Sequence, residues 1–180
     1  MSRVIFIPGK NLDLCILDKE RHFKNCIQWI NNGKITEFTG ETGVFPTSRE
    51  KEEEWFNRQN QDDKSIVLAI ETKEEKFIGN LGLTQIDWIA RKAMGGIIIG
   101  ESKEWNKGYA TETGKLLINY SFNALNLEKV YVYIILENKG SIKVAEKLGF
   151  KREGLLKNHF FKNGLYHDVS IMSVFKKDWP

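Results

Sequence analysis

The sequence contains few residues of several kinds that would point to a particular structural class. Its 180 residues include only two cysteines, three prolines and three histidines. Cys15 and Cys26 lie in apolar segments with no second pair nearby, which predicts buried thiols and argues against a disulfide framework or a zinc site. Internal repeats and Pro- or Ser-rich linkers are also missing, so we expect a single domain over residues 1–180.

Charge and hydropathy exclude further classes of protein. Lys and Arg number 27 and Asp and Glu number 24, and the basic residues alternate with acidic ones rather than forming a block. This pattern does not favour a nucleic-acid-binding surface. No apolar run is long enough to span a bilayer, and the N-terminus lacks the order of a signal peptide. We therefore expect a cytoplasmic protein that binds neither nucleic acid nor membrane.

Strand and helix patterns follow one another regularly along the chain. β-rich runs occupy residues 4–17, 65–71, 76–87, 94–100, 129–136, 150–161 and 166–175. Helical patterns occupy residues 18–30, 49–60, 110–125 and 139–148. Asn163-Gly164 predicts a hairpin turn, and the isoleucine run 97–99 predicts a strand buried on both faces. Antiparallel strands followed by strand–helix–strand–helix–strand predict a mixed-sheet α/β fold.

The segment from Glu104 to Thr111 combines features of a phosphate-binding loop. Gly108 can adopt backbone angles that other residues resist, and the small Ala110 lets an anion approach the backbone. The first turn of the following helix has unpaired N–H groups and a partial positive charge, to which Lys107 adds. Neither the P-loop spacing nor the dinucleotide-binding glycine fingerprint is present. A pyrophosphate site is therefore a hypothesis here, beside the alternative of a structural turn.

Three motifs together resemble one family. The run 105–112, Trp-Asn-Lys-Gly-Tyr-Ala-Thr-Glu, is similar to the acetyl-CoA loop of GNAT N-acetyltransferases. Asn138 and Ser141, followed by Lys-Leu-Gly-Phe at 147–150, match a second family segment. Asn163-Gly164 with Asp168 resembles the closing hairpin of the RimJ/RimL-like branch, which includes ribosomal-protein and polyamine acetyltransferases. The likeness covers the chain from about Ile78 to its end.

The resemblance implies a fold and a co-substrate site. The fold would be the GNAT fold, a mixed and mostly antiparallel central sheet with splayed central strands, flanked by helices. The co-substrate would be acetyl-CoA, with no metal. The backbone of Ile98, Ile99 and Gly100 would pair with the pantetheine arm, which Asn138 would also bind, with Ser141 near the sulfur. The pyrophosphate would lie on Trp105, Asn106, Lys107, Gly108, Tyr109, Ala110 and Thr111.

Two positions depart from the family's catalytic pattern. Many relatives have a Glu where this chain has Met94 and a Tyr where it has Ala145. We therefore expect Ser141 as the acid for the thiolate and His159, or a water chain, as the base. Tyr166 and His167, or Asp87 and Glu101, are other candidates. From chemistry alone, a helix cap at Asn138 followed by a first-turn hydroxyl at Ser141 is the favoured interpretation, and only the family pattern favours a binding role for Asn138.

The amine acceptor is less well determined by the sequence. A protein N-terminus is the first expectation, with a polyamine or another small-molecule amine as the alternative. Glu37, Glu41 and the acids at 50–54 lie among aromatic residues and would suit a cationic acceptor, although a solvated helix face explains 50–54 better. Two alternative functions are not enzymatic: a non-catalytic acyl-CoA-binding regulator and a purely structural interaction domain. A homodimer is possible by analogy with relatives.

Overall fold

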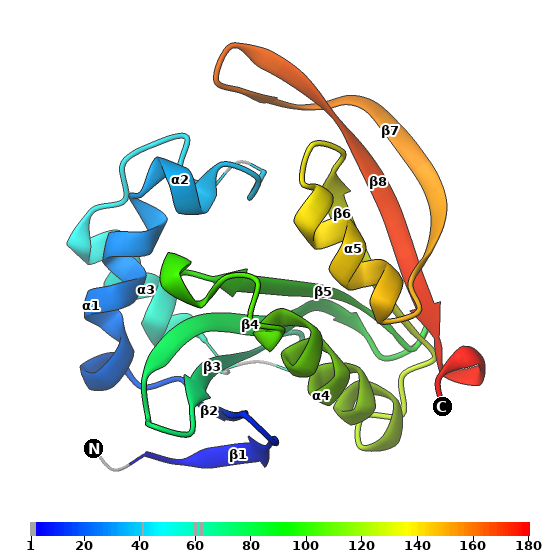
Figure 1. The fold of residues 1–180 in the computed structure, drawn as a ribbon, viewed down its shortest axis with the longest axis horizontal. Helices are drawn as coiled ribbons and strands as arrows, with labels where there is room; N and C mark the ends of the chain where they lie inside the picture. The colour runs from blue at the N-terminus through cyan, green and yellow to red at the C-terminus, as the bar shows by residue number, and fades with distance from the viewer. Residues whose placement is uncertain (1–2, 41, 60, 62) are drawn as a thin grey trace.

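The computed structural model describes residues 3–40, 42–59, 61 and 63–180. In this part of the chain one eight-stranded sheet has the order β1-β2-β3-β4-β5-β6-β8-β7 (Figure 1). All neighbouring strands are antiparallel except β5 and β6, which run parallel. The strands are β1 Ile5–Pro8, β2 Leu12–Ile16, β3 Ile66–Thr72, β4 Phe77–Asp87, β5 Lys92–Ile99, β6 Lys129–Ile135, β7 Lys151–Lys162 and β8 Leu165–Phe175.

Helices cover both faces of this sheet. They are α1 Lys19–Ile30, α2 Gly33–Thr36, α3 Arg49–Arg58, α4 Tyr109–Asn123 and α5 Lys139–Lys147, with 3-10 turns η1 Ser102–Glu104 and η2 Lys176–Asp178. Helices α4 and α5 pack Leu117, Phe122 and Ala145 into the larger core. Helices α1 and α3 pack Cys26 and Phe56 into the smaller one, which also holds Cys15. Both thiols are free and buried, as predicted.

Several local signals in the sequence predicted these boundaries correctly. The Asp18 side chain accepts a hydrogen bond from the Arg21 amide and begins α1. Gly149, with φ of 80°, follows the end of α5, and Asn163-Gly164 forms the β7–β8 turn with φ of 54° and 79°. The helix predicted over residues 49–60 ends at Arg58, and Asn60 lies outside the described residues. Glu41 also lies outside them.

The sheet is divided where β5 meets β6. These strands pair only through Lys92↔Lys129, Ala93↔Val130 and Met94↔Tyr131, and no pairing between them is recorded beyond Met94 among the described residues. This confirms the splayed central strands. The prediction of two-sided burial at residues 97–99 is wrong, because the Ile98 side chain is 37% exposed. Ile98 lies beyond the split, where the described part of β5 has no pairing with β6, so hydrophobicity alone overestimated its burial.

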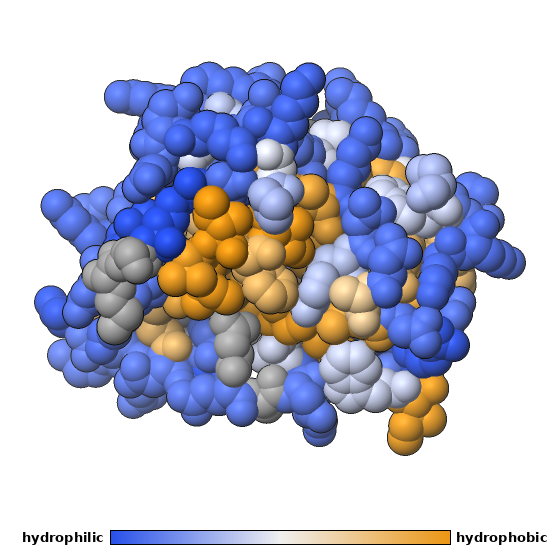
Figure 2. Space-filling view, turned by 90° about the horizontal axis from the view of Figure 1, so that it is seen from below, coloured by the Kyte–Doolittle hydropathy of each residue, from blue (hydrophilic) through white to orange (hydrophobic). Residues whose placement is uncertain are grey.

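The outer strand β1 leaves apolar side chains in solvent. Val4, Ile5 and Phe6 are each more than 40% exposed. The view from below shows apolar side chains gathered on this face of the molecule (Figure 2). Among the described residues, no helix has both the length and the apolar character needed to cross a membrane.

Candidate active site

The loop after β5 presents an uncapped helix terminus. Gly108 precedes α4 with φ of 87°, and no side chain caps the terminus. The Thr111 and Glu112 amides donate to the Gly108 carbonyl, so the earlier N–H groups at Tyr109 and Ala110 belong to the unpaired first turn. A Cβ atom on Gly108 would meet nothing within 4 Å, so the loop is open on this side. These features fit an anion such as a pyrophosphate.

Charged side chains fix the base of this loop. The Glu104 carboxylate is buried and accepts from the Lys107 ammonium at 2.8 Å and from the Lys76 ammonium at 2.9 Å. The Lys107 hydrogen bond, with that of Lys76, lowers the pKa of Glu104, which therefore stays ionised. Lys107 is thus partly neutralised by Glu104, and the backbone N–H groups carry much of the expected attraction for an anion.

The backbone of β5 is available on one side only. The Gly100 amide donates to the Ile78 carbonyl on β4 at 2.9 Å. Because backbone groups alternate in direction along a strand, those of Ile98 also face β4 and those of Ile99 face the gap. The indole Nε1 of Trp105 donates to the Ile99 carbonyl at 2.7 Å. Of the three residues predicted to pair with the pantetheine arm, Ile98, Ile99 and Gly100, only Ile99 therefore has backbone groups that face the gap.

Across the gap, α5 begins with a capped turn. The Oδ1 atom of Asn138 accepts a hydrogen bond from the Ser141 amide at 3.0 Å. The structure therefore contains the helix cap that the sequence allowed. The cap uses only the oxygen of the Asn138 side chain, so its amide NH2 group can still bind a ligand.

The face of the sheet opposite α4 and α5 carries neutral and aromatic groups beside the gap. The Tyr131 hydroxyl donates to Gln85 Oε1 at 2.9 Å. The Tyr133 ring stacks on His159, with 6.3 Å between the ring centroids. Gly96 is exposed, and a Cβ atom there would meet nothing within 4 Å. An acceptor bound here would contact an open sheet surface at Gly96, beside the rings of Tyr131, Tyr133 and His159.

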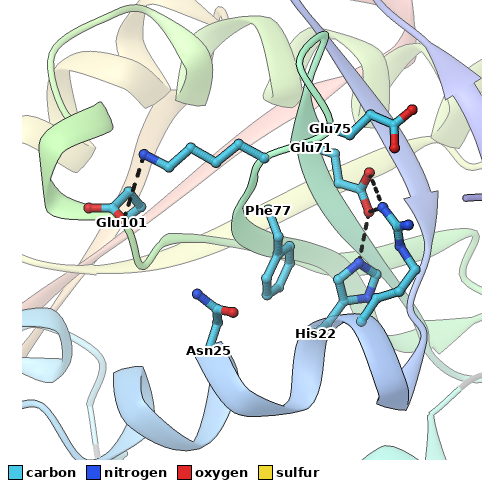
Figure 3. A pocket seen from close by; sticks show the side chains of 8 residues that line it. His22, Asn25, Glu71, Glu75, Phe77 and Glu101 are labelled. Atoms are coloured by element: carbon cyan, nitrogen blue, oxygen red, sulfur yellow. Dashed lines mark hydrogen bonds and ion pairs between the residues drawn. The ribbon is translucent and has the colours of Figure 1, made fainter.

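A separate polar cavity of about 360 Å³ lies between α1 and the start of β4 (Figure 3). The residues that line it include Arg21, His22, Glu71, Lys76 and Glu101. None of the residues predicted to bind acetyl-CoA is among them. The buried Glu71 carboxylate binds Nε2 of His22 at 2.8 Å and Arg21 at 3.0 Å. His22 Nδ1 accepts from the Asp18 amide, so both ring nitrogens are already used. This arrangement joins α1 to β3 and is structural.

Known proteins share this architecture. A family model described as an acetyltransferase (GNAT) domain matches residues 15–151. The chain belongs to the GNAT family. It is 33% identical over 127 residues, 71% of this chain and 73% of the relative, to a spermidine N(1)-acetyltransferase of Vibrio cholerae. It is 34% identical over 124 residues, 69% and 67% of the two chains, to "Putative ribosomal N-acetyltransferase YdaF" of Bacillus subtilis.

A solved structure agrees over almost the whole length. Spermidine N-acetyltransferase from Vibrio cholerae in complex with CoA and spermine superposes with a TM-score of 0.86 at 30% identity. The match covers 93% of this chain and 97% of that one. The GNAT fold and the family resemblance are confirmed, and this GNAT protein is an acetyl-CoA-dependent N-acetyltransferase.

The predicted residues of the GNAT site fall into two groups. The run 105–111 follows β5 and the turn η1, and its last three residues form the first turn of α4. Trp105 is hydrogen-bonded to Ile99. Asn138 and Ser141 are joined by the cap on the other side of the gap. His159 comes from β7 and contacts Tyr133 and Phe160, neither of which the sequence singled out. The roles of Ser141 and His159 stay predictions.

The arrangement suits attack of an amine on a thioester. When bound, acetyl-CoA supplies an activated carbonyl carbon. The uncapped start of α4 and the gap edge of β5 fit the pyrophosphate and pantetheine parts, and the Ile99 N–H faces the gap where an oxyanion would develop. Met94 and the buried Ala145 carry no acid or base. Positioning of the two reactants therefore has to supply much of the acceleration.

Proposed function

We propose that this enzyme acetylates small-molecule amines of the polyamine class, with acetyl-CoA as the acetyl donor. The supporting observation is the similarity, over 93% of the chain, to a spermidine acetyltransferase solved with CoA and spermine. The sequence alone put a protein N-terminus first, and the relatives favour its alternative.

Two carboxylates, one on the residue before the α5 cap and one on the residue after α2, would suit a cationic acceptor. Glu137 directly precedes Asn138, is half exposed and lies 3.6 Å from Nδ1 of His167. Glu37 follows α2; burial lowers the pKa of Lys162 in the closing hairpin, and the charge of Glu37 partly opposes that lowering. A second ammonium group of a polyamine could approach either carboxylate while the first reaches the gap. Ser141 is proposed as the acid and His159 as the base.

The first experiment is an acetylation assay that follows thiol release with spermidine, spermine, a monoamine and short peptides with free N-termini. We expect spermidine and spermine to give the highest kcat/KM, with products heavier by one acetyl group. A peptide that exceeds both polyamines would overturn the proposal in favour of the protein-N-terminus function, for which the ribosomal-type relative is the supporting observation.

The matched control is a variant in which the expected pyrophosphate site is blocked. Gly108→Trp with Ala110→Asp places bulk and a negative charge at the uncapped start of α4, where a pyrophosphate is expected. Calorimetric titration should show that native protein binds acetyl-CoA and that the folded double variant does not. Binding that survives in the variant would place the co-substrate elsewhere.

A further inference from the structure

A lysine of the closing hairpin is buried against a loop that lies more than 100 residues earlier in the chain. Lys162, the last residue of β7, is 6% exposed. Its ammonium donates hydrogen bonds to the carbonyl oxygens of Gly40 at 3.2 Å and Thr42 at 2.7 Å. It also donates to the Thr36 carbonyl. Three backbone carbonyls, that of Thr36 at the end of α2 and those of Gly40 and Thr42 in the loop after it, therefore converge on a single side chain.

The match between this ammonium and its surroundings is chemical as well as geometric. A buried ammonium is costly unless it is hydrogen-bonded, and an ammonium has three N–H donors. The loop provides three acceptors, all of them backbone carbonyls. An apolar or shorter side chain at position 162 would remove a charged donor from all three carbonyls. The Thr36 carbonyl would keep the amide and hydroxyl of Thr39, and the Thr42 carbonyl would keep the Thr39 hydroxyl.

The backbone of the loop is shaped for this contact. We call residues 36–40 and 42–43 the covering loop. Gly40 and Gly43 have φ of 59° and 78°, a region that favours glycine. The Phe160 ring of the hairpin lies 3.0 Å from the place of a Cβ atom on Gly40, so a second hairpin residue packs on the same loop. Lys162 and Phe160 together hold the covering loop against β7.

This contact extends to the amine side of the active site. Tyr133 lies on β6 beyond the split from β5, and its ring stacks on His159. The His159 ring contacts Phe160, at 4.8 Å between centroids, and Phe160 packs on Gly40. A continuous series of contacts therefore runs from the gap through the hairpin to the covering loop. The covering loop is therefore connected through the hairpin to the strand that lies across the split from β5.

We propose that Lys162 is a positioning residue for acetyl transfer, because its ammonium fastens the covering loop to the hairpin and so closes the amine end of the site. The inference rests on the proposed function in taking an amine as the occupant of that end. Lys162 acts through the covering loop, and its ammonium is committed to the three carbonyls.

The test compares Lys162→Met with Lys157→Met, a matched change at an exposed lysine of the same strand. Hydrogen exchange of a peptide spanning residues 33–47 should be faster in Lys162→Met and unchanged in Lys157→Met. The KM for the amine should rise about tenfold in Lys162→Met while the KM for acetyl-CoA stays within about twofold. A structural defect alone would alter both constants or lower kcat without this split.

Failure of this inference can be told apart from failure of the proposed function. If the native enzyme acetylates none of the amines, the proposed function fails. The role of Lys162 is then tested by hydrogen exchange of the covering loop and by the rate of acetyl-CoA hydrolysis in the absence of an amine. Hydrolysis should rise about threefold in Lys162→Met, because an open loop admits water to the thioester. The inference is overturned if Lys162→Met leaves hydrogen exchange of the loop unchanged. It is also overturned if the variant leaves the amine KM unchanged where the native enzyme is active, or the hydrolysis rate unchanged where it is not.

A second variant covers the case in which Lys162→Met does not fold. Lys162→Arg keeps the positive charge, but its planar guanidinium cannot direct three donors from one nitrogen to three converging carbonyls. The same pattern of faster loop exchange and raised amine KM is expected, to a smaller extent. Native-like behaviour of Lys162→Arg on both measures would show that charge alone suffices and would contradict the three-carbonyl arrangement as the cause.

Discussion

At the scale of single residues, Gly108 shows how one backbone conformation supports a binding site. Its φ of 87° costs an L-residue about 1 kcal/mol, whereas the open space around it imposes no steric clash. We therefore predict that Gly108→Ala lowers the free energy of unfolding by about 1 kcal/mol. Urea denaturation of the purified variant measures this.

Gly33, the first residue of α2, provides the matched control. A Cβ atom at Gly33 also meets nothing within 4 Å, but its φ is not positive. Gly33→Ala should leave stability unchanged or raise it by roughly 0.5 kcal/mol, because alanine loses less entropy in a helix. Equal effects at both glycines would show that the left-handed conformation is not what restricts position 108.

Single residues also mark the limit of prediction from sequence. Asp18, Gly149 and Asn163-Gly164 act on neighbours within a few positions, so their roles could be predicted from the local pattern. Lys162 and the Tyr131–Gln85 hydrogen bond join residues that are 46 to 126 positions apart. Since nothing in the neighbouring sequence specifies such partners, only the fold identifies them.

At the scale of secondary-structure elements, the start of α5 combines two functions that mutation can separate. Asn138 Oδ1 caps the helix, while its NH2 group is the predicted donor to the pantetheine arm. Asn138→Ser keeps an N-cap acceptor and loses the NH2 group, whereas Asn138→Ala loses both. We expect the Ser variant to keep its stability but bind acetyl-CoA about tenfold more weakly.

The Ala variant should show the same loss of binding together with about 1 kcal/mol less stability. Titration calorimetry and thermal unfolding of the two variants give both quantities. Native-like affinity in Asn138→Ser would mean that Asn138 is only a helix cap.

Elements also explain the main error in the predicted fold. The isoleucine run of β5 has the composition of a strand covered on both faces, but β5 leaves β6 after Met94. Exposure of Ile98 therefore follows from the divergence of two strands, a property of the pair. The sequence of β5 alone does not encode it, whereas the family resemblance did predict the splayed strands.

At the scale of the whole molecule, one buried ionic cluster joins distant segments. Glu71 on β3 binds Arg3, Arg21 and His22, and Arg3 also binds Asp13 on β2. Burial would raise the pKa of Glu71, but hydrogen bonds from His22, Arg21 and Arg3 lower it below its usual value. Burial lowers the pKa of His22, which fits a neutral ring whose Nδ1 accepts from Asp18.

This cluster gives stability a predictable dependence on pH. His22 has a folded pKa below the unfolded value of 6.5, so the unfolded chain takes up a proton first as the pH falls. Stability should therefore decrease below pH 6.5, and decrease further below 4.5, where Glu71 is protonated first in the unfolded chain. Urea unfolding between pH 7.5 and about 5 should show a flatter slope for His22→Gln than for native protein.

The same unfolding curves test the predicted single domain. One sheet runs from β1 to β7, so we propose that residues 1–180 unfold in a single transition. Two separated transitions would contradict this. The homodimer and the cytoplasmic location also stay predictions.

Trp105 makes the enzyme a reporter of its own co-substrate site. Its indole N–H is bonded to the Ile99 carbonyl, and the Lys34 ammonium lies 5.5 Å from the centre of its ring. A pantetheine N–H that bonds to the Ile99 carbonyl would compete with this indole, and a bound pantetheine arm would change the polarity around the chromophore. Binding of acetyl-CoA should then be visible as a shift in intrinsic fluorescence, without any label. Titration would give the affinity for the co-substrate whichever amine is the acceptor.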